Sequence, residues 1–191
     1  MSNEYKDWER DKIEEENQAI TEYPFLRARN IDGTIDTESK FPMIGLEIPN
    51  GWYKLFFQMC DDIKTILEEK GKLNDFYFIQ VKEKYNELVC YSNGEGSPAV
   101  EVILQKYGYI ARFVCVNCGM PAHYETRGYI ASLCETCFRN NGFERDICDD
   151  LEFKDSYEVV GFRDGKSYKS IVSVKDEWNR YLQNFCGEAD V

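Results

Sequence analysis

Two cysteine pairs of the form Cys-x-x-Cys constrain this chain more than any other feature. Cys115 and Cys118 form the first pair, Cys134 and Cys137 form the second, and fifteen residues lie between the pairs. This spacing is typical of a four-cysteine zinc site, because two residues between thiolates let a tight turn direct both sulfurs at one ion. Gly119 follows the first pair and can adopt the positive φ that closes such a turn. The sequence therefore predicts a zinc site with four protein ligands: Cys115, Cys118, Cys134 and Cys137.

Four thiolates leave no open coordination position, so we expect the ion to be structural and not catalytic. Structural zinc contributes about 10–16 kcal/mol of apparent free energy, so residues 113–140 should unfold without metal. An iron centre and a redox-active dithiol are the alternatives for the same cysteines. His123, the only histidine of the chain, lies between the pairs and could replace one cysteine, although a surface position is the simpler interpretation. The other cysteines have no ligand spacing and are expected to be buried or inert thiols: Cys60, Cys90, Cys148 and Cys186.

The eight cysteines also bear on the cellular compartment. The first seventeen residues are acidic and lack the basic and apolar regions of a signal peptide. No apolar run approaches the roughly 18–20 residues that a membrane helix needs. We therefore expect a protein of the reducing cytosol, without contact with a membrane, in which cysteines bind metal or stay free instead of forming disulfides.

The charge balance narrows the choice of partner. The chain has 35 acidic and 23 basic side chains, a net charge of −12. A protein that binds the phosphate backbone needs an excess of Lys and Arg, so this balance argues against direct nucleic-acid binding and favours a protein with a basic surface. One strip of acids is either a solvated linker or an array of carboxylates that imitates phosphates in a basic groove. Its members are Glu144, Asp146, Asp149, Asp150, Glu152 and Asp155.

Apolar periodicity predicts the secondary structure. The first strong helical pattern covers residues 52–67, with Asn50 as its cap and Gly71 as its end. A β-hairpin over 76–91 and a second helix from Ser97-Pro98 to about residue 110 follow. Short strands near 122–127 and 129–133 connect the cysteine pairs, and Asp164-Gly165 predicts the turn of a hairpin over 157–174 before a last helix over 175–186.

These elements predict an α+β protein in which a helix–hairpin–helix unit precedes a four-cysteine zinc-ribbon-like module and a C-terminal β-hairpin plus helix. We divide the chain accordingly. We expect residues 1–40 to form an acidic helical arm and an extended connection, and the helix over 3–20 is either solvated or docks on a partner. Residues 41–112 form the α+β core, 113–140 the zinc module, and 141–191 the hairpin–helix module.

Catalytic motifs are scarce. With one histidine, a hydrolase would have to use His123 beside the metal, and the chain has no P-loop, dinucleotide fingerprint, HExxH or zinc-deaminase pattern. Asp75, Gln80 and Lys82 loosely resemble the acid plus (D/E/Q)xK pattern of Mg²⁺-dependent nucleases, although Lys82 also fits a solvated strand face. We therefore expect a non-enzymatic protein, with the nuclease as one alternative. The other alternative is a zinc-ribbon regulator that binds DNA or RNA through Lys106, Arg112, Arg127 and Arg139.

Several segments together resemble one family. They are Tyr23-Pro-Phe-Leu26, Gly51-Trp52, Gln80-Val-Lys-Glu-Lys-Tyr85, Lys106-Tyr107, Cys118-Gly-Met-Pro-Ala122, Thr126-Arg-Gly-Tyr-Ile130 and Cys134-Glu-Thr-Cys137. The set resembles four-cysteine zinc-binding accessory proteins encoded by phages, prophages and other mobile elements of gut Firmicutes, and it covers roughly residues 20–140. The resemblance implies a zinc-binding accessory protein in a bacterial host cytoplasm and assigns no catalytic residue.

The acidity, the small size and the lack of a catalytic motif lead to one functional hypothesis. We expect the protein to bind and inhibit a host or phage protein with a basic surface. An anti-defence role fits this chemistry: an anti-CRISPR or anti-restriction inhibitor would occupy the basic nucleic-acid-binding groove of an effector.

Overall fold

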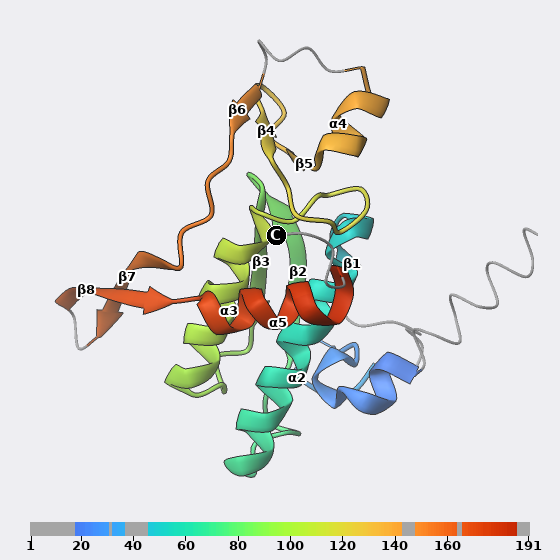
Figure 1. The fold of residues 1–191 in the computed structure, drawn as a ribbon. Coiled ribbons are helices and arrows are strands. Elements are labelled where there is room, and N and C mark those ends of the chain that lie inside the picture. The colour runs from blue at the N-terminus through green and yellow to red at the C-terminus, as the bar shows by residue number, and fades with distance from the viewer. Residues whose placement is uncertain (1–17, 31, 37–45, 143–147, 164–165, 187–191) are drawn as a thin grey trace, which may run out of the picture.

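The computed structural model of the chain describes residues 18–30, 32–36, 46–142, 148–163 and 166–186 (Figure 1). It has the mixed composition of helices and small sheets that the α+β prediction requires. The helical elements are η1 (Pro24–Leu26), η2 (Asn50–Trp52), α2 (Tyr53–Glu69), α3 (Pro98–Ala111), α4 (Glu135–Asn140), α5 (Lys175–Tyr181) and η4 (Leu182–Cys186). The strands are β1 (Leu46–Glu47), β2 (Phe78–Lys84), β3 (Glu87–Ser92), β4 (Tyr124–Thr126), β5 (Ser132–Leu133), β6 (Cys148–Asp150), β7 (Ser156–Arg163) and β8 (Lys166–Ser173).

Helix α2 is the centre of the main core and confirms the helix predicted over 52–67. The apolar side chains that recur at helical spacing over this range are fully buried except Ile66, which is half-buried. The buried ones are Trp52, Leu55, Phe56, Met59, Ile63 and Leu67. Gly71 follows the helix with a φ of +65°, as expected of a residue that ends one. The predicted cap at Asn50 is wrong, because the chain enters α2 through the 3-10 turn η2 and no side chain caps that entry.

The predicted hairpin of the core is also confirmed. Strands β2 and β3 pair antiparallel, and Tyr85 and Asn86 between them have φ values of +52° and +63°. Two positive φ angles in a two-residue loop define the type I′ turn, whose twist matches that of the strands. The short strand β1 adds to the other edge of β2 in parallel, so the sheet has the order β1-β2-β3. Helix α3 then packs on α2 and on β3.

The described residues from Cys115 to Asp150, which include the four predicted ligands, form what we call the four-cysteine region. This region lies above the core in Figure 1 and has its own small sheet, in the order β5-β4-β6. Strands β4 and β5 fall inside the two segments predicted as strands, and both are shorter than predicted. Strand β6 comes from beyond residue 140 and pairs with β4, with Glu125 opposite Asp149. The chain on both sides of residue 141 therefore contributes to one sheet.

The C-terminal part of the chain consists of the predicted hairpin β7-β8 and the helix α5, which continues into η4. The turn at 164–165 lies outside the described residues. Helix α5 crosses α2 and α3 (Figure 1), and the Gln58 amide donates to the Glu177 carbonyl at 3.0 Å while the Lys106 ammonium pairs with the Glu177 carboxylate at 2.6 Å. Of the predicted N-terminal arm, residues 1–17 lie outside the described residues, and residues 18–22 are helical with Ala19 buried.

Candidate metal centre

The sulfur atoms of the four predicted ligands converge on one point. The Sγ atoms of Cys115, Cys118, Cys134 and Cys137 all lie within 4.8 Å of one another, and Cys118 and Cys134 are 3.5 Å apart. None of the four is in a disulfide. Thiolates that surround a tetrahedral ion at about 2.3 Å would be about 3.8 Å apart, so the donor set matches the size of such a site. The structure therefore brings together a group of cysteines that could hold a metal ion.

The first pair lies on a tight turn after α3. The backbone N–H of Cys115 donates to the Met120 carbonyl at 2.8 Å, and the N–H of Gly119 donates to the Cys115 carbonyl at 3.0 Å. Gly119 has a φ of +80°, which a side chain would disfavour. These bonds fold residues 115–120 back on themselves, so both thiols of the pair face the same point.

The second pair is at the start of α4. Cys134 is the residue before the helix, and its Sγ accepts a hydrogen bond from the backbone N–H of Cys137 at 3.4 Å. The antiparallel pairing of β4 with β5 returns the chain from the first pair to this position. The Tyr124 and Phe138 rings, 4.5 Å apart, pack beside the site and cover part of it.

Burial of the four thiols is unequal, and this affects their ionisation. Cys115 and Cys134 are buried, Cys137 is half-buried and Cys118 is exposed. Burial raises the pKa of the Cys115 thiol, but hydrogen bonds from the backbone of Cys134 and Cys118 outweigh it and lower the net pKa. Burial raises the pKa of the Cys118 thiol. Several thiolates at this separation repel one another, and a divalent cation would remove that repulsion.

Three residues outside the motif donate hydrogen bonds to the first cysteine turn or to the residue just before it. The backbone N–H of Gly51 donates to the Val116 carbonyl at 2.9 Å, the Trp52 indole donates to the Val114 carbonyl at 3.0 Å, and the Tyr181 hydroxyl donates to the Gly119 carbonyl at 2.6 Å. All three donors are buried. The turn is therefore joined to the start of α2 and to the end of α5.

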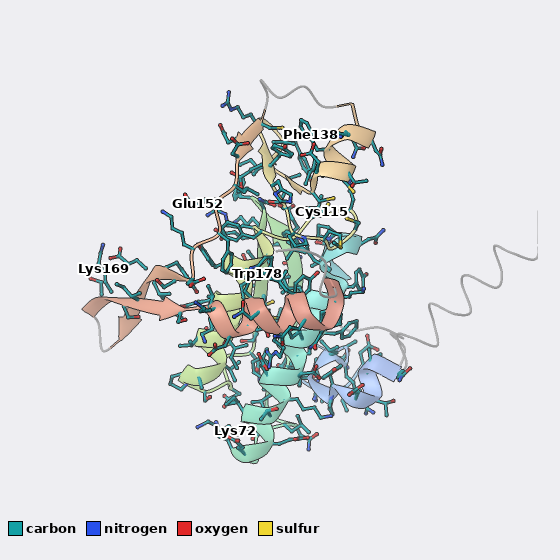
Figure 2. The ribbon with its side chains drawn as sticks, viewed as in Figure 1. Lys72, Cys115, Phe138, Glu152, Lys169 and Trp178 are labelled. Atoms are coloured by element: carbon teal, nitrogen blue, oxygen red, sulfur yellow. The ribbon has the colours of Figure 1, made fainter. Side chains whose placement is uncertain are left out.

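Gly51 is essential to this contact for a steric reason. A Cβ atom at this position would lie 2.0 Å from the Cys115 carbonyl oxygen and 2.7 Å from the Gly119 nitrogen. Figure 2 places Cys115 at this junction between the helical core and the four-cysteine region, with Phe138 farther out on α4. The roles of Gly51 and Tyr181 could not be predicted from the sequence, because a glycine before a helix and a tyrosine on an apolar face carry no signal of a distant contact.

Among the described residues, the histidine and the other cysteines do not belong to the four-sulfur group. His123 is exposed, and its backbone pairs with Leu133 and Leu151 in the small sheet. Cys60 and Cys148 are buried and Cys90 is half-buried, while the side chain of Cys186 lies outside the described residues. Burial raises the pKa of the Cys60 and Cys90 thiols, which makes both poor nucleophiles at neutral pH.

The residues of the nuclease alternative are only partly brought together. Gln80 and Lys82 lie on one face of β2, where the Gln80 amide contacts the Glu47 carboxylate at 3.4 Å and the Lys82 ammonium lies 5.4 Å from the centre of the Tyr91 ring. Asp75 is exposed in the turn before β2. Within the described ranges, the only group of three or more potential metal ligands is the cysteine group.

The acidic strip is partly neutralised. Asp149 on β6 pairs with Arg127 at 2.5 Å, and Asp155 pairs with Lys175 at 3.0 Å. Asp150 and Glu152 are exposed, while Glu144 and Asp146 lie outside the described residues. The Arg127 guanidinium lowers the pKa of the Asp149 carboxyl, so this carboxyl stays ionised to a lower pH than an ordinary aspartate.

The basic residues of the nucleic-acid alternative are all paired with acids. Lys106 pairs with Glu177 at 2.6 Å, and Arg112 lies between Glu87 at 3.9 Å and Glu125 at 3.7 Å. The other two arginines of the set, Arg127 and Arg139, pair with Asp149 and Glu135. An ion pair lowers the net positive charge that these side chains offer to a phosphate.

No family model, curated protein or solved structure matches the chain. Over the described residues, no helix is both long and apolar enough to cross a membrane.

Proposed function

We propose that this chain is a zinc protein whose ion is structural, in a zinc-ribbon-like region, and that it acts by binding another protein. The observation that carries the first part is the four-sulfur group: four thiols within 4.8 Å form a complete donor set for tetrahedral zinc. Their chemistry favours zinc over calcium or magnesium, because soft thiolates select zinc and related metals, while the harder ions take oxygen ligands.

The protein-binding role rests on charge. The net charge of −12 opposes close approach to a nucleic acid, and the four cations of the nucleic-acid alternative are already paired with acids. The exposed acids Asp150 and Glu152 extend the strip beside the four-cysteine region. A basic protein surface is the partner that this chemistry fits best.

Within this class we propose inhibition of a nucleic-acid-binding effector in a bacterial cytoplasm. The protein would occupy the basic groove of the effector and compete with nucleic acid for it, as an anti-CRISPR or anti-restriction inhibitor would. An origin in a phage or mobile element is part of the same proposal.

Native mass spectrometry tests the metal. The protein expressed in zinc-supplemented medium should contain one zinc ion per chain, and Cys134→Ser should contain none. Cys148→Ser makes the same atomic change at another buried thiol of this region and should keep the ion. A folded wild-type protein without metal would overturn the proposal.

A pull-down from a bacterial lysate tests the partner. The wild type should retain a basic nucleic-acid-binding protein, and retention should fall from about 50 to about 300 mM salt, because at about 0.1 M salt the attraction between exposed charges is largely screened beyond about 10 Å and this distance shortens as salt rises. Glu152→Lys should weaken retention without changing the zinc content. Capture that does not depend on salt, or that Glu152→Lys leaves unchanged, would contradict an electrostatic mechanism at this strip.

A further inference from the structure

A groove of about 400 Å³ lies between the core and the C-terminal hairpin, away from the four cysteines. Residues 87–90 of β3 form one wall, residues 157–159 of β7 form the other, and α3 contributes the floor. The volume falls in the range of about 300–1,000 Å³ that is usual for binding pockets.

Both walls of the groove are edge strands. Strand β3 is the last strand of the order β1-β2-β3, and β7 pairs only with β8 among the described strands. An edge strand presents unpaired backbone N–H and C=O groups that can bind an added strand. At Leu88 the edge of β3 is covered by α3, since a Cβ atom at Gly108 would lie 3.1 Å from the Leu88 carbonyl oxygen, so an added strand would bond to other groups of this edge.

The charge of the side chains that line the groove indicates what kind of segment would bind there. Glu87, Glu101 and Glu158 line the groove, and the lining contains no Lys or Arg. Glu158 has a partner, Lys169 at 2.7 Å, and Glu87 lies 3.9 Å from Arg112. Between the acids the lining is apolar, from Leu104 on α3 and Val159 on β7. Such a lining fits an extended segment in which basic and apolar side chains alternate.

One residue that lines the groove has an unsatisfied polar group. The hydroxyl of Tyr157 is buried and has no hydrogen-bond partner, while its ring stacks on Tyr109 with the ring centres 4.3 Å apart. Burial and the neighbouring Tyr109 and Glu87 raise the pKa of this hydroxyl, so it stays protonated and can donate a hydrogen bond. A buried polar group without a partner is costly, and a backbone carbonyl of a bound segment would satisfy it.

We propose that the groove between β3 and β7 binds an extended basic segment of a partner protein by adding it as a strand. This inference rests on the proposed function in taking a basic protein as the partner, and it places a second contact apart from the acidic strip. Backbone hydrogen bonds to the two edges give affinity, and Glu101, together with the partly neutralised Glu87 and Glu158, selects Lys and Arg.

The test uses the full-length protein and three synthetic probes. The first is an eight-residue peptide in which Lys and Arg alternate with Val. The second has the same charge but Pro in place of Val, so it lacks half of the backbone N–H donors and cannot pair along both of its edges as a strand. The third is spermine, a flexible cation without a peptide backbone. Titration calorimetry gives the affinities, and amide chemical shifts locate the binding.

The Val peptide should bind, should shift the amides of residues 87–90 and 157–159, and should bind more tightly than the Pro peptide or spermine. Glu101→Lys should weaken it about fivefold or more, because it places a like charge beside the bound cations. Asp176→Lys is the matched control: it makes the same change in the first turn of α5, outside the groove, and should keep the affinity.

Tyr157→Phe separates binding from folding. The hydroxyl has no partner in the free protein, so its loss should not lower the unfolding midpoint, yet it should weaken the Val peptide about threefold. No binding of the Val peptide, equal binding of the Pro peptide or spermine, or shifts confined to residues 148–155 would overturn the proposal. Since the probes are synthetic, such a failure leaves the zinc site and the lysate partner to their own tests.

Discussion

The main core and the four-cysteine region are stabilised by different means. The core is built from large apolar side chains of α2, α3 and the sheet, and Trp52, Phe56 and Phe78 are among its buried members. The four-cysteine region has a small buried cluster, whose members among the described residues are Cys115, Leu133, Cys134, Phe138 and Cys148. Three of these five are cysteines, and two of those belong to the four-sulfur group.

This difference indicates how much stabilising free energy the proposed zinc ion would have to contribute. A buried side chain such as Phe contributes about 1.5–3 kcal/mol of transfer free energy, so a cluster with only Leu133 and Phe138 as large apolar members offsets little of the entropy of ordering its segment. A four-thiolate zinc site contributes more than such a cluster. We therefore expect the region to depend on the proposed zinc ion and on the three hydrogen bonds from Gly51, Trp52 and Tyr181.

The largest effect should come from the metal ligands. Cys115→Ser should lose zinc and leave residues 113–140 unfolded, since it forfeits much of the about 10–16 kcal/mol that structural zinc supplies. Cys148→Ser should keep both zinc and fold and cost about 1–2 kcal/mol. Zinc content and near-ultraviolet circular dichroism measure the two outcomes. If the two variants had the same zinc content and the same circular dichroism, Cys115 would not differ from an ordinary buried thiol and the prediction would be wrong.

A substitution in the main core should lower the stability of the protein and leave its zinc content unchanged. Phe56 is fully buried among the aromatic rings of the core, so Phe56→Ala should lower the free energy of unfolding by about 3–5 kcal/mol. Below its unfolding transition the variant should still contain one zinc ion per chain. Urea unfolding followed by tryptophan fluorescence, with zinc analysis of the folded fraction, checks both statements. Loss of zinc from folded Phe56→Ala would mean that the two regions are not separately stabilised.

The contact between the regions should be next in size. Gly51→Ala places a Cβ atom against backbone atoms of the first cysteine turn, which cannot rotate away, and should cost about 2–3 kcal/mol. Gly94→Ala is the comparison, because Gly94 has a φ of +79° and no atom within 4 Å of an added Cβ. It should cost about 1 kcal/mol from backbone strain alone. A smaller effect at Gly51 than at Gly94 would contradict the contact.

Tyr181→Phe removes a single hydrogen bond from the same junction. The Gly119 carbonyl would lose a buried donor at 2.6 Å, which should cost about 1–2 kcal/mol and raise the rate of zinc release. Tyr109→Phe loses only an exposed bond of 3.4 Å and should leave both quantities unchanged. Thermal unfolding and zinc transfer to a chromogenic chelator give the two readouts. Unchanged zinc release in Tyr181→Phe would exclude coupling through this bond.

The smallest effect should come from the exposed pair of Arg127 and Asp149. The pKa of Asp149 is lowered by its bond to Arg127, so the pair stabilises the protein above the ordinary Asp pKa of 3.8 and loses this contribution as the pH falls through its depressed value. Asp149→Asn should therefore lower the thermal midpoint slightly at pH 7, and the difference from the wild type should shrink as the pH falls below 3.8. A difference in thermal midpoint between wild type and variant that grows as the pH falls would contradict a stabilising ion pair at this site.

Local patterns predicted most of the elements, because each depends on neighbours along the chain. The apolar face of α2, the turn at Tyr85 and Asn86, and the convergence of the four cysteines follow from periodicity, turn propensity and ligand spacing. The cap at Asn50 failed because η2 replaces the ordinary first turn. Gly51, the middle residue of η2, donates to the Val116 carbonyl, and no local pattern contains this tertiary contact.

The contacts between distant segments could not be predicted in the same way. Tyr181 and Gly119 are 62 residues apart, and β6 joins β4 through Cys148 and Thr126. Each contact depends on how the chain closes in space, and the residues involved have no composition that marks them. The pairing of Asp149 with Arg127 could not be predicted either, so the acidic strip is partly neutralised in the fold by a residue from outside it.

Hydrogen exchange with and without a zinc chelator tests the central claim most directly. With zinc bound, the amides of residues 115–138 and 148–150 should be protected, as should those in the middle of α2 and α3. After chelation, the first set should exchange at least about a hundredfold faster, while the middle of α2 and α3 keeps most of its protection. Unchanged protection of residues 115–138 in the metal-free protein would contradict the claim that the ion, and not an apolar core, stabilises the four-cysteine region.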